Sequence, residues 1–91
     1  MIKLSDKISV STEVVAREVG NETVLLDLSS GTYFGLDPVG ARIWQLLDSG
    51  KTLAEVCDMM IEEYEVVREV LESDTLALAG ELAAKGLVSV Q

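Results

Sequence analysis

The pair Asp37-Pro38 constrains the fold of this chain more than any other feature of its sequence. It contains the only proline, and an aspartate cap followed by proline in the first turn is typical of a helix start. Before this pair, short β-branched runs partly alternate apolar and polar residues. After it, apolar residues recur every three or four positions. The sequence therefore predicts an α+β fold, with a strand-rich N-terminal third and a helical remainder.

The segment before Asp37 predicts three strands. Residues 7–11 and 14–19 are short and β-branched, and together they predict a first strand that is bent or bulged near residues 12–13. Residues 20–21 (Gly-Asn) are a turn signal. Residues 23–28 predict a second strand, because apolar side chains alternate along it.

Residues 29–31 (Ser-Ser-Gly) predict a three-residue hairpin loop that leads into a third strand ending at Leu36. Glycine fits the left-handed position that closes such a loop. The resulting pairs are Leu28 with Thr32, Asp27 with Tyr33, Leu26 with Phe34, and Val24 with Leu36. This register is favoured because it gathers Val24, Leu26, Leu28, Phe34 and Leu36 on one face. Tyr33 then lies on the opposite face.

Three helices are expected after Asp37, over about residues 38–48, 53–64 and 66–85. Thr52 and Glu55 have the spacing of a capping box at the start of the second helix. The predicted core stripes are Val39, Ile43, Trp44 and Leu47 in the first helix, Leu53, Val56, Cys57, Met60, Ile61 and Tyr64 in the second, and Leu71, Thr75, Leu78 and Leu82 in the third. Residues 87–90 are expected to trail off as an extended tail.

These elements predict one domain over residues 1–91, because a chain of this length leaves no room for two. A small N-terminal antiparallel three-stranded sheet followed by three α-helices has the element order of a winged helix-turn-helix. The fold class expected is therefore α+β and winged helix-turn-helix-like.

The composition argues against most catalytic functions. The chain has no histidine, the commonest general base and metal ligand, and its single cysteine, Cys57, cannot build a zinc site. Cys57 falls on an apolar stripe and is expected to be a small buried hydrophobe. No phosphate-binding glycine motif is present. We therefore expect no enzyme activity, no metal site and no cofactor.

The net charge of −9 argues against anionic partners. Nucleic-acid binding depends on Lys and Arg side chains, and an acidic chain is repelled by anionic membranes. The N-terminus lacks the apolar core of a signal peptide, and no apolar run approaches the roughly 20 residues of a membrane span. We therefore expect a cytoplasmic protein that binds neither nucleic acid nor membrane.

Two specific alternatives fit poorly. A DNA-binding winged helix needs basic or amide side chains on its recognition helix, but the third helix offers only Arg68 and Lys85 among many acids. An acyl carrier protein carries Asp-Ser-Leu at the start of its second helix. Here residues 48–50 read Asp-Ser-Gly and lie in a helix-ending linker, and a strand-rich N-terminus has no place in that four-helix fold.

An ordered series of short motifs over about residues 22–90 resembles the PqqD-like proteins, which are precursor-peptide recognition domains in the biosynthesis of ribosomally made, modified peptides. Each motif alone is weak, but their order and spacing together are specific. The motifs are Leu26-Asp27, Gly31, Tyr33-Phe34, Leu36-Asp37, Gly40, Ile43-Trp44, Gly50, Thr52, Glu55, Leu82 and Gly86-Leu87. With Trp44 in the first helix, the sequence is more similar to the stand-alone lasso-peptide members of this family than to the pyrroloquinoline quinone member.

The resemblance implies a non-catalytic domain that binds the leader segment of a precursor, commonly through a Tyr-x-x-Pro pattern in lasso leaders. The leader adds as a strand beside the third strand, in a groove whose other wall is the third helix, and the precursor then passes to a separate leader peptidase. The implied peptide-binding residues are Thr32, Tyr33, Phe34, Gly35, Leu36, Val67, Val70, Leu71, Asp74 and Leu78. Core packing explains Phe34, Leu36, Leu71 and Leu78 equally well.

The physical chemistry of an edge strand agrees with this function. An edge strand has unpaired N–H and C=O groups that an added strand can satisfy, and Gly35 allows a close approach of its backbone. The same edge could pair with a second copy of the chain to form a homodimer. The function expected is leader-peptide recognition, and the alternative is a winged-helix adaptor for another protein partner.

Overall fold

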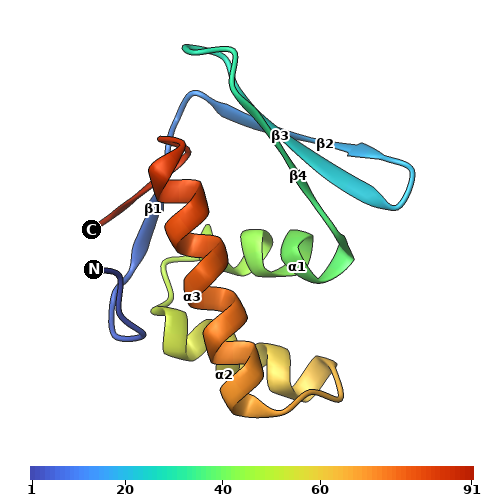
Figure 1. The fold of residues 1–91 in the computed structure, drawn as a ribbon, viewed down its shortest axis with the longest axis vertical. Helices are drawn as coiled ribbons and strands as arrows, with labels where there is room; N and C mark the ends of the chain where they lie inside the picture. The colour runs from blue at the N-terminus through green and yellow to red at the C-terminus, as the bar shows by residue number, and fades with distance from the viewer.

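A computed structural model describes all 91 residues, which form two small antiparallel sheets and three helices (Figure 1). The elements in chain order are β1 (Ile8–Val10), β2 (Val14–Val19), β3 (Glu22–Asp27), β4 (Tyr33–Leu36), α1 (Pro38–Leu47), α2 (Leu53–Glu63), α3 (Arg68–Ala84) and β5 (Val88–Val90). The predicted α+β class is confirmed. In Figure 1 the β2-β3-β4 sheet lies at one end of the molecule and α2 at the other.

The three-stranded sheet is a meander of two hairpins in the order β2-β3-β4. The first hairpin pairs Val19 with Glu22 and turns through the two residues Gly20 and Asn21. Gly20 has φ +65°, the left-handed value that the first central residue of such a turn requires. The predicted turn at residues 20–21 is confirmed.

The predicted register of the second hairpin is wrong by one residue. Leu25 pairs with Phe34, and Leu26 pairs with Tyr33. The loop has four residues, 28–31, and is closed by the Asp27 N–H donating to the Thr32 carbonyl (2.8 Å). As a result Leu25, rather than Val24, Leu26 and Leu28, shares the core face with Phe34 and Leu36. Tyr33 does lie on the opposite face, as predicted.

The physical reason for this shift is the carboxylate of Asp27. Its Oδ1 accepts hydrogen bonds from the Ser29 N–H (2.9 Å) and the Ser29 hydroxyl (2.7 Å). These bonds bind Ser29 to the end of β3 and draw Leu28 into the loop. Asp27 is itself buried, and these bonds satisfy its carboxylate.

The N-terminal segment forms two strands in different sheets, rather than one bent strand. β1 and β2 are separated at Thr12-Glu13, the position where a bend was predicted. β1 pairs with β5, so the expected extended tail is a strand of a second sheet. Two further backbone bonds, from Ser11 N–H to the Leu87 carbonyl and from Gln91 N–H to the Lys7 carbonyl, extend this pairing.

α1 and α2 begin at the predicted residues, α3 begins two residues later than predicted, and each helix ends one residue before its predicted end. Asp37 caps α1 by accepting the Gly40 N–H (2.7 Å), with Pro38 in the first turn. Thr52 and Glu55 form the predicted capping box of α2, since each side chain accepts the other residue's backbone N–H. α3 begins at Arg68 without a side-chain cap. None of the helices is long and apolar enough to cross a membrane.

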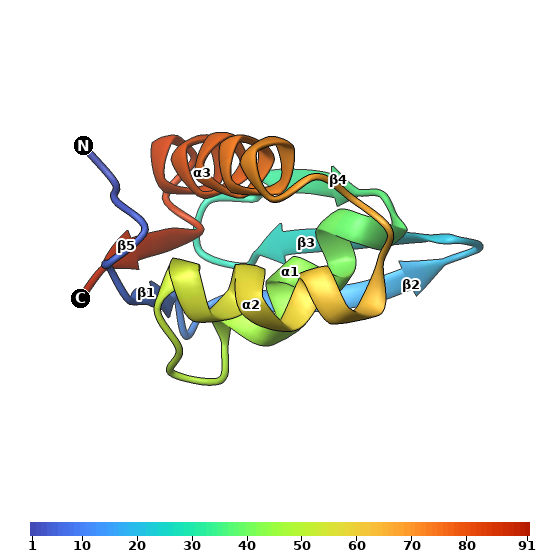
Figure 2. The same cartoon turned by 90° about the horizontal axis from the view of Figure 1, so that it is seen from below.

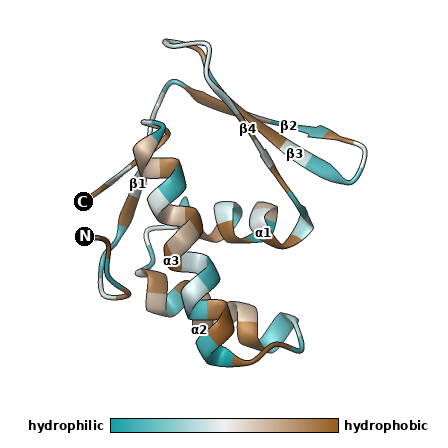
Figure 3. Cartoon of the chain, in the orientation of Figure 1, coloured by the Kyte–Doolittle hydropathy of each residue, from teal (hydrophilic) through white to brown (hydrophobic).

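The core lies between the three helices, the inner face of the three-stranded sheet and β1 (Figure 3). Cys57 is buried within it, as predicted, with its sulfur 3.7 Å from the Thr75 hydroxyl, and burial raises the pKa of its thiol. The predicted core stripes need four corrections. Val39 and Tyr64 are exposed, and Ile61 and Leu78 are only half-buried. In α3, Ala79 takes the fully buried place that was expected of Leu78.

Candidate functional site

The edge of β4 is open, because β4 pairs with β3 on one side only. In an antiparallel ladder, residues that exchange hydrogen bonds with the neighbouring strand alternate with residues that do not. The bond from Asp27 to Thr32 sets this alternation, so that Phe34 and Leu36 bond to β3. The backbone N–H and C=O groups of Tyr33 and Gly35 therefore point away from β3, toward the open edge.

A cavity of about 370 Å³ lies beside β4. It has three walls: β4 with the α1 cap, the first two turns of α1, and the middle of α3. Figure 2 shows α3 and β4 side by side, with α1 beneath them. The lining residues are Phe34, Gly35, Leu36, Asp37, Val39, Gly40, Ile43, Asp74 and Leu78.

Gly40 sets the depth of this cavity where β4 passes into α1. A Cβ at this position would lie 3.2 Å from the Asp37 carboxylate oxygen that caps the helix and 3.4 Å from Leu36. A glycine therefore lets the first turn of α1 approach the end of β4 closely. Because of this close approach, the bond from the Gly40 N–H to Asp37 forms at the floor of the cavity.

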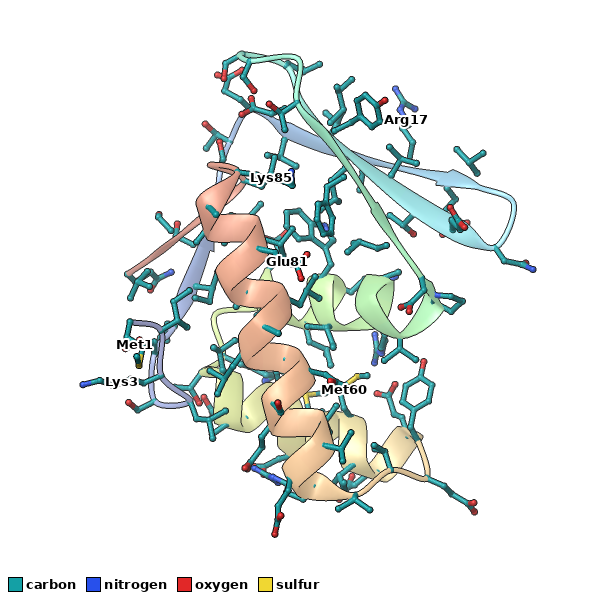
Figure 4. The ribbon with its side chains drawn as sticks, viewed as in Figure 1. Met1, Lys3, Arg17, Met60, Glu81 and Lys85 are labelled. Carbon is teal, nitrogen blue, oxygen red and sulfur yellow. The ribbon has the colours of Figure 1, made fainter.

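A second cavity of about 260 Å³ lies between α1, the end of α2 and the start of α3. Its lining residues are Val39, Ile43, Met60, Tyr64, Glu65, Val66, Leu71 and Asp74. Met60, labelled in Figure 4, lies where α2 and α3 meet. Val39, Ile43 and Asp74 line both cavities, so the two cavities are adjacent. We call the pair the β4–α3 groove.

The charged groups on this groove are carboxylates. Asp37, Glu65 and Asp74 line it, and no lysine or arginine does. Arg42 is paired with Glu63 (2.8 Å), and Arg68 is paired with Glu72 (2.8 Å) and Asp58. These partners hold the pKa of each guanidinium above its usual value, chiefly through hydrogen bonds to the carboxylates. The groove therefore favours a ligand that is apolar or basic over an acidic one.

A cation–aromatic contact joins α3 to Phe34, near the start of β4. The Lys85 amine lies 5.9 Å from the centre of the Phe34 ring, over its face. Lys85 is labelled at the end of α3 nearest the sheet (Figure 4). This contact connects the end of α3 to β4 and holds the Phe34 ring at the groove.

The structure brings six of the ten predicted site residues together. Phe34, Gly35, Leu36, Asp74 and Leu78 line the first cavity, and Leu71 and Asp74 line the second. The other four line neither cavity. Thr32 precedes β4, Tyr33 offers its backbone while its side chain is exposed, and Val67 and Val70 are exposed near the start of α3.

The sequence did not predict the contribution of α1 or of the α2–α3 connection to the groove. Val39 and Ile43 were expected in the core stripe of α1, and Tyr64 in that of α2, while Glu65 and Val66 were not singled out. One signal was present: Val39 falls in the first turn directly after Asp37, where a helix start lies at the end of β4. Its position beside β4 could have suggested a groove residue.

Comparison with known proteins gives a consistent picture. The sequence matches the family described as coenzyme PQQ synthesis protein D (PqqD) over residues 22–88. The structure of TbiB1 in complex with the TbiA(β) leader peptide is similar, with 44% sequence identity, a TM-score of 0.80, and coverage of 89% of this chain and 94% of that one. A lasso peptide synthetase B1 complexed with the leader peptide is similar at 32% identity, with a TM-score of 0.81 and coverage of 91% and 98%. A search of curated proteins gives no significant match.

Proposed function

Since the chain belongs to the PqqD family, we propose that it binds the leader segment of a ribosomally made precursor peptide by adding that segment as a strand to β4. The observation that carries this proposal is the open edge of β4 beside the β4–α3 groove. Support comes from the two similar structures, which are both complexes with leader peptides. Both of those proteins align with most of this chain.

Strand addition supplies affinity through the backbone and selectivity through the side chains. Tyr33 and Gly35 each offer one N–H and one C=O to an added strand, which leaves four backbone groups for the leader to satisfy. Alternate side chains of the leader would then point toward the β4–α3 groove, where Phe34, Leu36 and Leu78 present apolar surface. Main-chain bonds alone would bind any extended peptide, so the groove provides the selection.

The groove also explains why the leader should choose β4 over β2. β2 has an open edge too, because it pairs only with β3. Neither cavity is lined by a residue of β2, and β2 carries the exposed charged side chains of Arg17 and Glu18. Charged side chains on an edge strand discourage pairing with another chain. The edge beside a groove is therefore the better docking site.

We further propose that the protein is a non-catalytic, cytoplasmic partner in lasso-peptide maturation that presents the precursor to a separate leader peptidase. The two similar leader-bound structures support the lasso assignment, since one is named a lasso peptide synthetase B1. Histidine is absent from the sequence, and no group of three metal-ligating side chains is found. Catalysis on the leader would then belong to the partner enzyme.

The test of leader binding is fluorescence polarisation with a labelled leader from a precursor gene beside the gene of this protein. We expect saturable 1:1 binding below tens of micromolar. A leader with single N-methyl groups, scanned along its length, should lose affinity at alternate positions of the docked segment, because alternate N–H groups bond to β4. Absence of binding to every neighbouring leader would reject the proposal and favour an adaptor for another protein.

Presentation to a peptidase needs a separate measurement. The rate at which the partner peptidase removes the leader is compared with and without this protein, at substrate concentrations below the leader Kd. We expect cleavage to accelerate with the wild-type chain and to fall back when an unlabelled leader segment competes for the groove. Cleavage that is indifferent to this protein would leave leader binding standing and reject presentation.

A further inference from the structure

One face of the β2-β3-β4 sheet is turned away from the three helices (Figure 1). Leu25 of β3 is buried in the core, so its neighbour Leu26 points to the opposite face. There Leu26 lies between Val15 of β2 and Tyr33 of β4, and the three side chains form an apolar row across the sheet. We call this side of the sheet the outer face.

Arg17 lies in the next row of the outer face. It is opposite Val24 of β3, which is in turn opposite Gly35 of β4. Figure 4 shows Arg17 on the side of the sheet away from the helices. Arg42 and Arg68 are held in ion pairs, but Arg17 forms none. The outer face therefore presents a free guanidinium beside an apolar row.

Exposure and residue type both indicate that a protein covers the outer face. Tyr33 and Val19 on this face are 72% and 63% exposed. Tyrosine and arginine are enriched at protein interfaces and carry much of the binding energy there, whereas lysine is depleted. The three strands contain Arg17 and Tyr33 but no lysine. An exposed apolar surface of this composition is typical of an interaction site.

A leader docked on β4 extends this face. The added strand is the fourth of the sheet, and its side chains alternate between the β4–α3 groove and the outer face. Those that enter the groove are enclosed by α1 and α3. Those on the outer face lie beside Tyr33 and Gly35 and remain accessible. A protein that lies on the outer face therefore contacts this chain and its bound leader together.

We propose that the outer face is the docking surface for the leader peptidase. The peptidase covers the apolar row and places a carboxylate opposite Arg17. The surface is complete only when the leader is bound, and the peptidase is the partner that has to distinguish the loaded protein from the free one. This inference rests on the proposed function and names the surface through which the leader is presented.

The main test is R17E. Arg17 lies in β2, two strands away from the edge where the leader docks, so the leader Kd should stay within about twofold of the wild-type value. The Kd of the peptidase for the leader-loaded protein should rise at least tenfold, because a carboxylate on the partner then meets a glutamate. Biolayer interferometry measures this Kd, with the isolated leader as the bound peptide so that no cleavage site is present.

The matched control is E18K. Glu18 is the next residue of β2 and points to the opposite face, so reversing its charge should change both Kd values less than about twofold. A second variant, V15K, adds a positive charge to the apolar row and should also weaken peptidase binding. Because R17E and V15K change the net charge in opposite directions, parallel losses cannot come from net charge. Circular dichroism checks folding, and R17E decides alone if V15K does not fold.

The dependence on leader gives an independent readout. The peptidase should bind the leader-loaded wild-type protein at least tenfold more tightly than the free protein, since the leader supplies part of the surface. Equal affinity for the two forms overturns a shared surface. Wild-type-like peptidase binding by folded R17E, or equal losses in R17E and E18K, overturns docking on the outer face. In each of these cases leader binding by the groove is unaffected.

The remaining outcomes identify a different failure. Analytical ultracentrifugation of the free chain tests the other possible occupant, a second copy. A wild-type dimer that R17E dissociates would assign the outer face to self-association and overturn the proposal. Failure of the wild-type protein to bind any leader overturns the proposed function itself, and the docking surface with it.

Discussion

At the scale of single residues, two backbone positions carry the proposed binding mode. The N–H groups of Tyr33 and Gly35 point to the open edge, so a proline at either position removes one donor from the leader without removing a bond to β3. We expect Y33P and G35P to weaken leader binding by about tenfold, the loss of roughly one hydrogen bond plus local adjustment. Fluorescence polarisation measures the change.

The other open edge offers the matched control for these prolines. The bond from Leu28 N–H to the Glu13 carbonyl sets the alternation along β2, and it makes Glu18 an outward-pointing residue. E18P therefore removes one outward N–H donor from β2, the open edge that is not expected to bind the leader. A loss of leader affinity in E18P equal to that in G35P would contradict docking on β4. Glu72 is a poor control, because it is paired with Arg68.

Asp27 gives a prediction about pH. Hydrogen bonds from the Ser29 hydroxyl and N–H hold the pKa of this carboxyl below its usual value of 3.8. A carboxyl whose pKa is lowered by folding stabilises the protein fully above its unfolded-state pKa, and this contribution is lost as the pH falls through the folded-state value. Asp27 therefore stabilises the fold fully above about pH 4, and this contribution is lost progressively as the pH falls further.

The substitution S29A removes the hydroxyl bond and keeps the backbone bond. We expect it to raise the pKa of Asp27 toward its usual value and to move acid unfolding to a higher pH. Carbon NMR of the carboxyl group measures the first change, and circular dichroism between pH 2 and 6 the second. The control is S11A, which removes a hydroxyl that accepts the Glu13 N–H and does not bond to Asp27. An Asp27 pKa unchanged in S29A would contradict the assigned cause.

At the scale of elements, the helices could be predicted from the sequence because their signals are local. Asp37, Thr52 and Glu55 act within one turn of the residues they cap, and the apolar spacing of each helix is visible in its own segment. The hairpin register depended instead on which face Asp27 occupies. The predicted register placed apolar side chains together on one face. That criterion does not anticipate that the Asp27 carboxylate is buried and accepts hydrogen bonds from Ser29, so the predicted register differs from the observed one by one residue.

Two walls of the groove could be predicted from the sequence, but its floor could not. β4 and α3 could be identified as its walls from the edge strand and the family resemblance. The floor is made by α1 and by the α2–α3 connection, and it exists only once α1 crosses beneath both walls. Val39 illustrates the point: its spacing predicts a core residue, while its place at the helix start leaves it at the groove.

The start of α2 gives a prediction about stability. Four N–H groups at the start of a helix lack helical partners. Here Leu53 N–H donates to the Asp6 carbonyl, Ala54 N–H to the Leu4 carbonyl, and Glu55 N–H to the Thr52 hydroxyl. We expect T52A to lower the free energy of unfolding by about 1 kcal/mol.

Urea unfolding measures the effect of T52A, and T52S, which retains the hydroxyl, serves as its control. Thr52 lines neither cavity, so the leader Kd should stay within about twofold of the wild-type value in both variants. A large loss of leader affinity in T52A would indicate that the start of α2 is coupled to the groove. Equal stability of T52A and T52S would contradict the capping role.

At the scale of the whole molecule, the two ends of the chain meet in one sheet. β1 and β5 are three residues each and lie almost the whole length of the chain apart, yet they pair with each other. Ile8 of β1 and Val88 of β5 are both buried. No local pattern distinguishes such a short strand from a tail, because its stabilisation comes entirely from a distant partner. This part of the fold could not be predicted from the sequence.

The open edge of β4 could bind a second copy of the chain as well as a leader, and the magnitudes favour the leader. Self-pairing would use the outward groups of Tyr33 and Gly35, which contribute roughly 0.5–1.5 kcal/mol per hydrogen bond. Four such bonds sum to about 2–6 kcal/mol, against a cost of about 4–15 kcal/mol for association. A leader makes the same bonds and also fills the groove. We therefore expect a monomer at micromolar concentrations.

Analytical ultracentrifugation with and without leader tests this expectation. The free chain should sediment as a monomer up to about 100 µM, and leader addition should give a 1:1 complex. Leader at about 100 times its Kd should also stabilise the fold by about 2.7 kcal/mol, since it binds the folded chain alone. If a dimer forms, its dissociation by leader would place it on β4, because one edge cannot pair with two strands. A dimer that persists with leader bound would contradict pairing through β4 and require another surface.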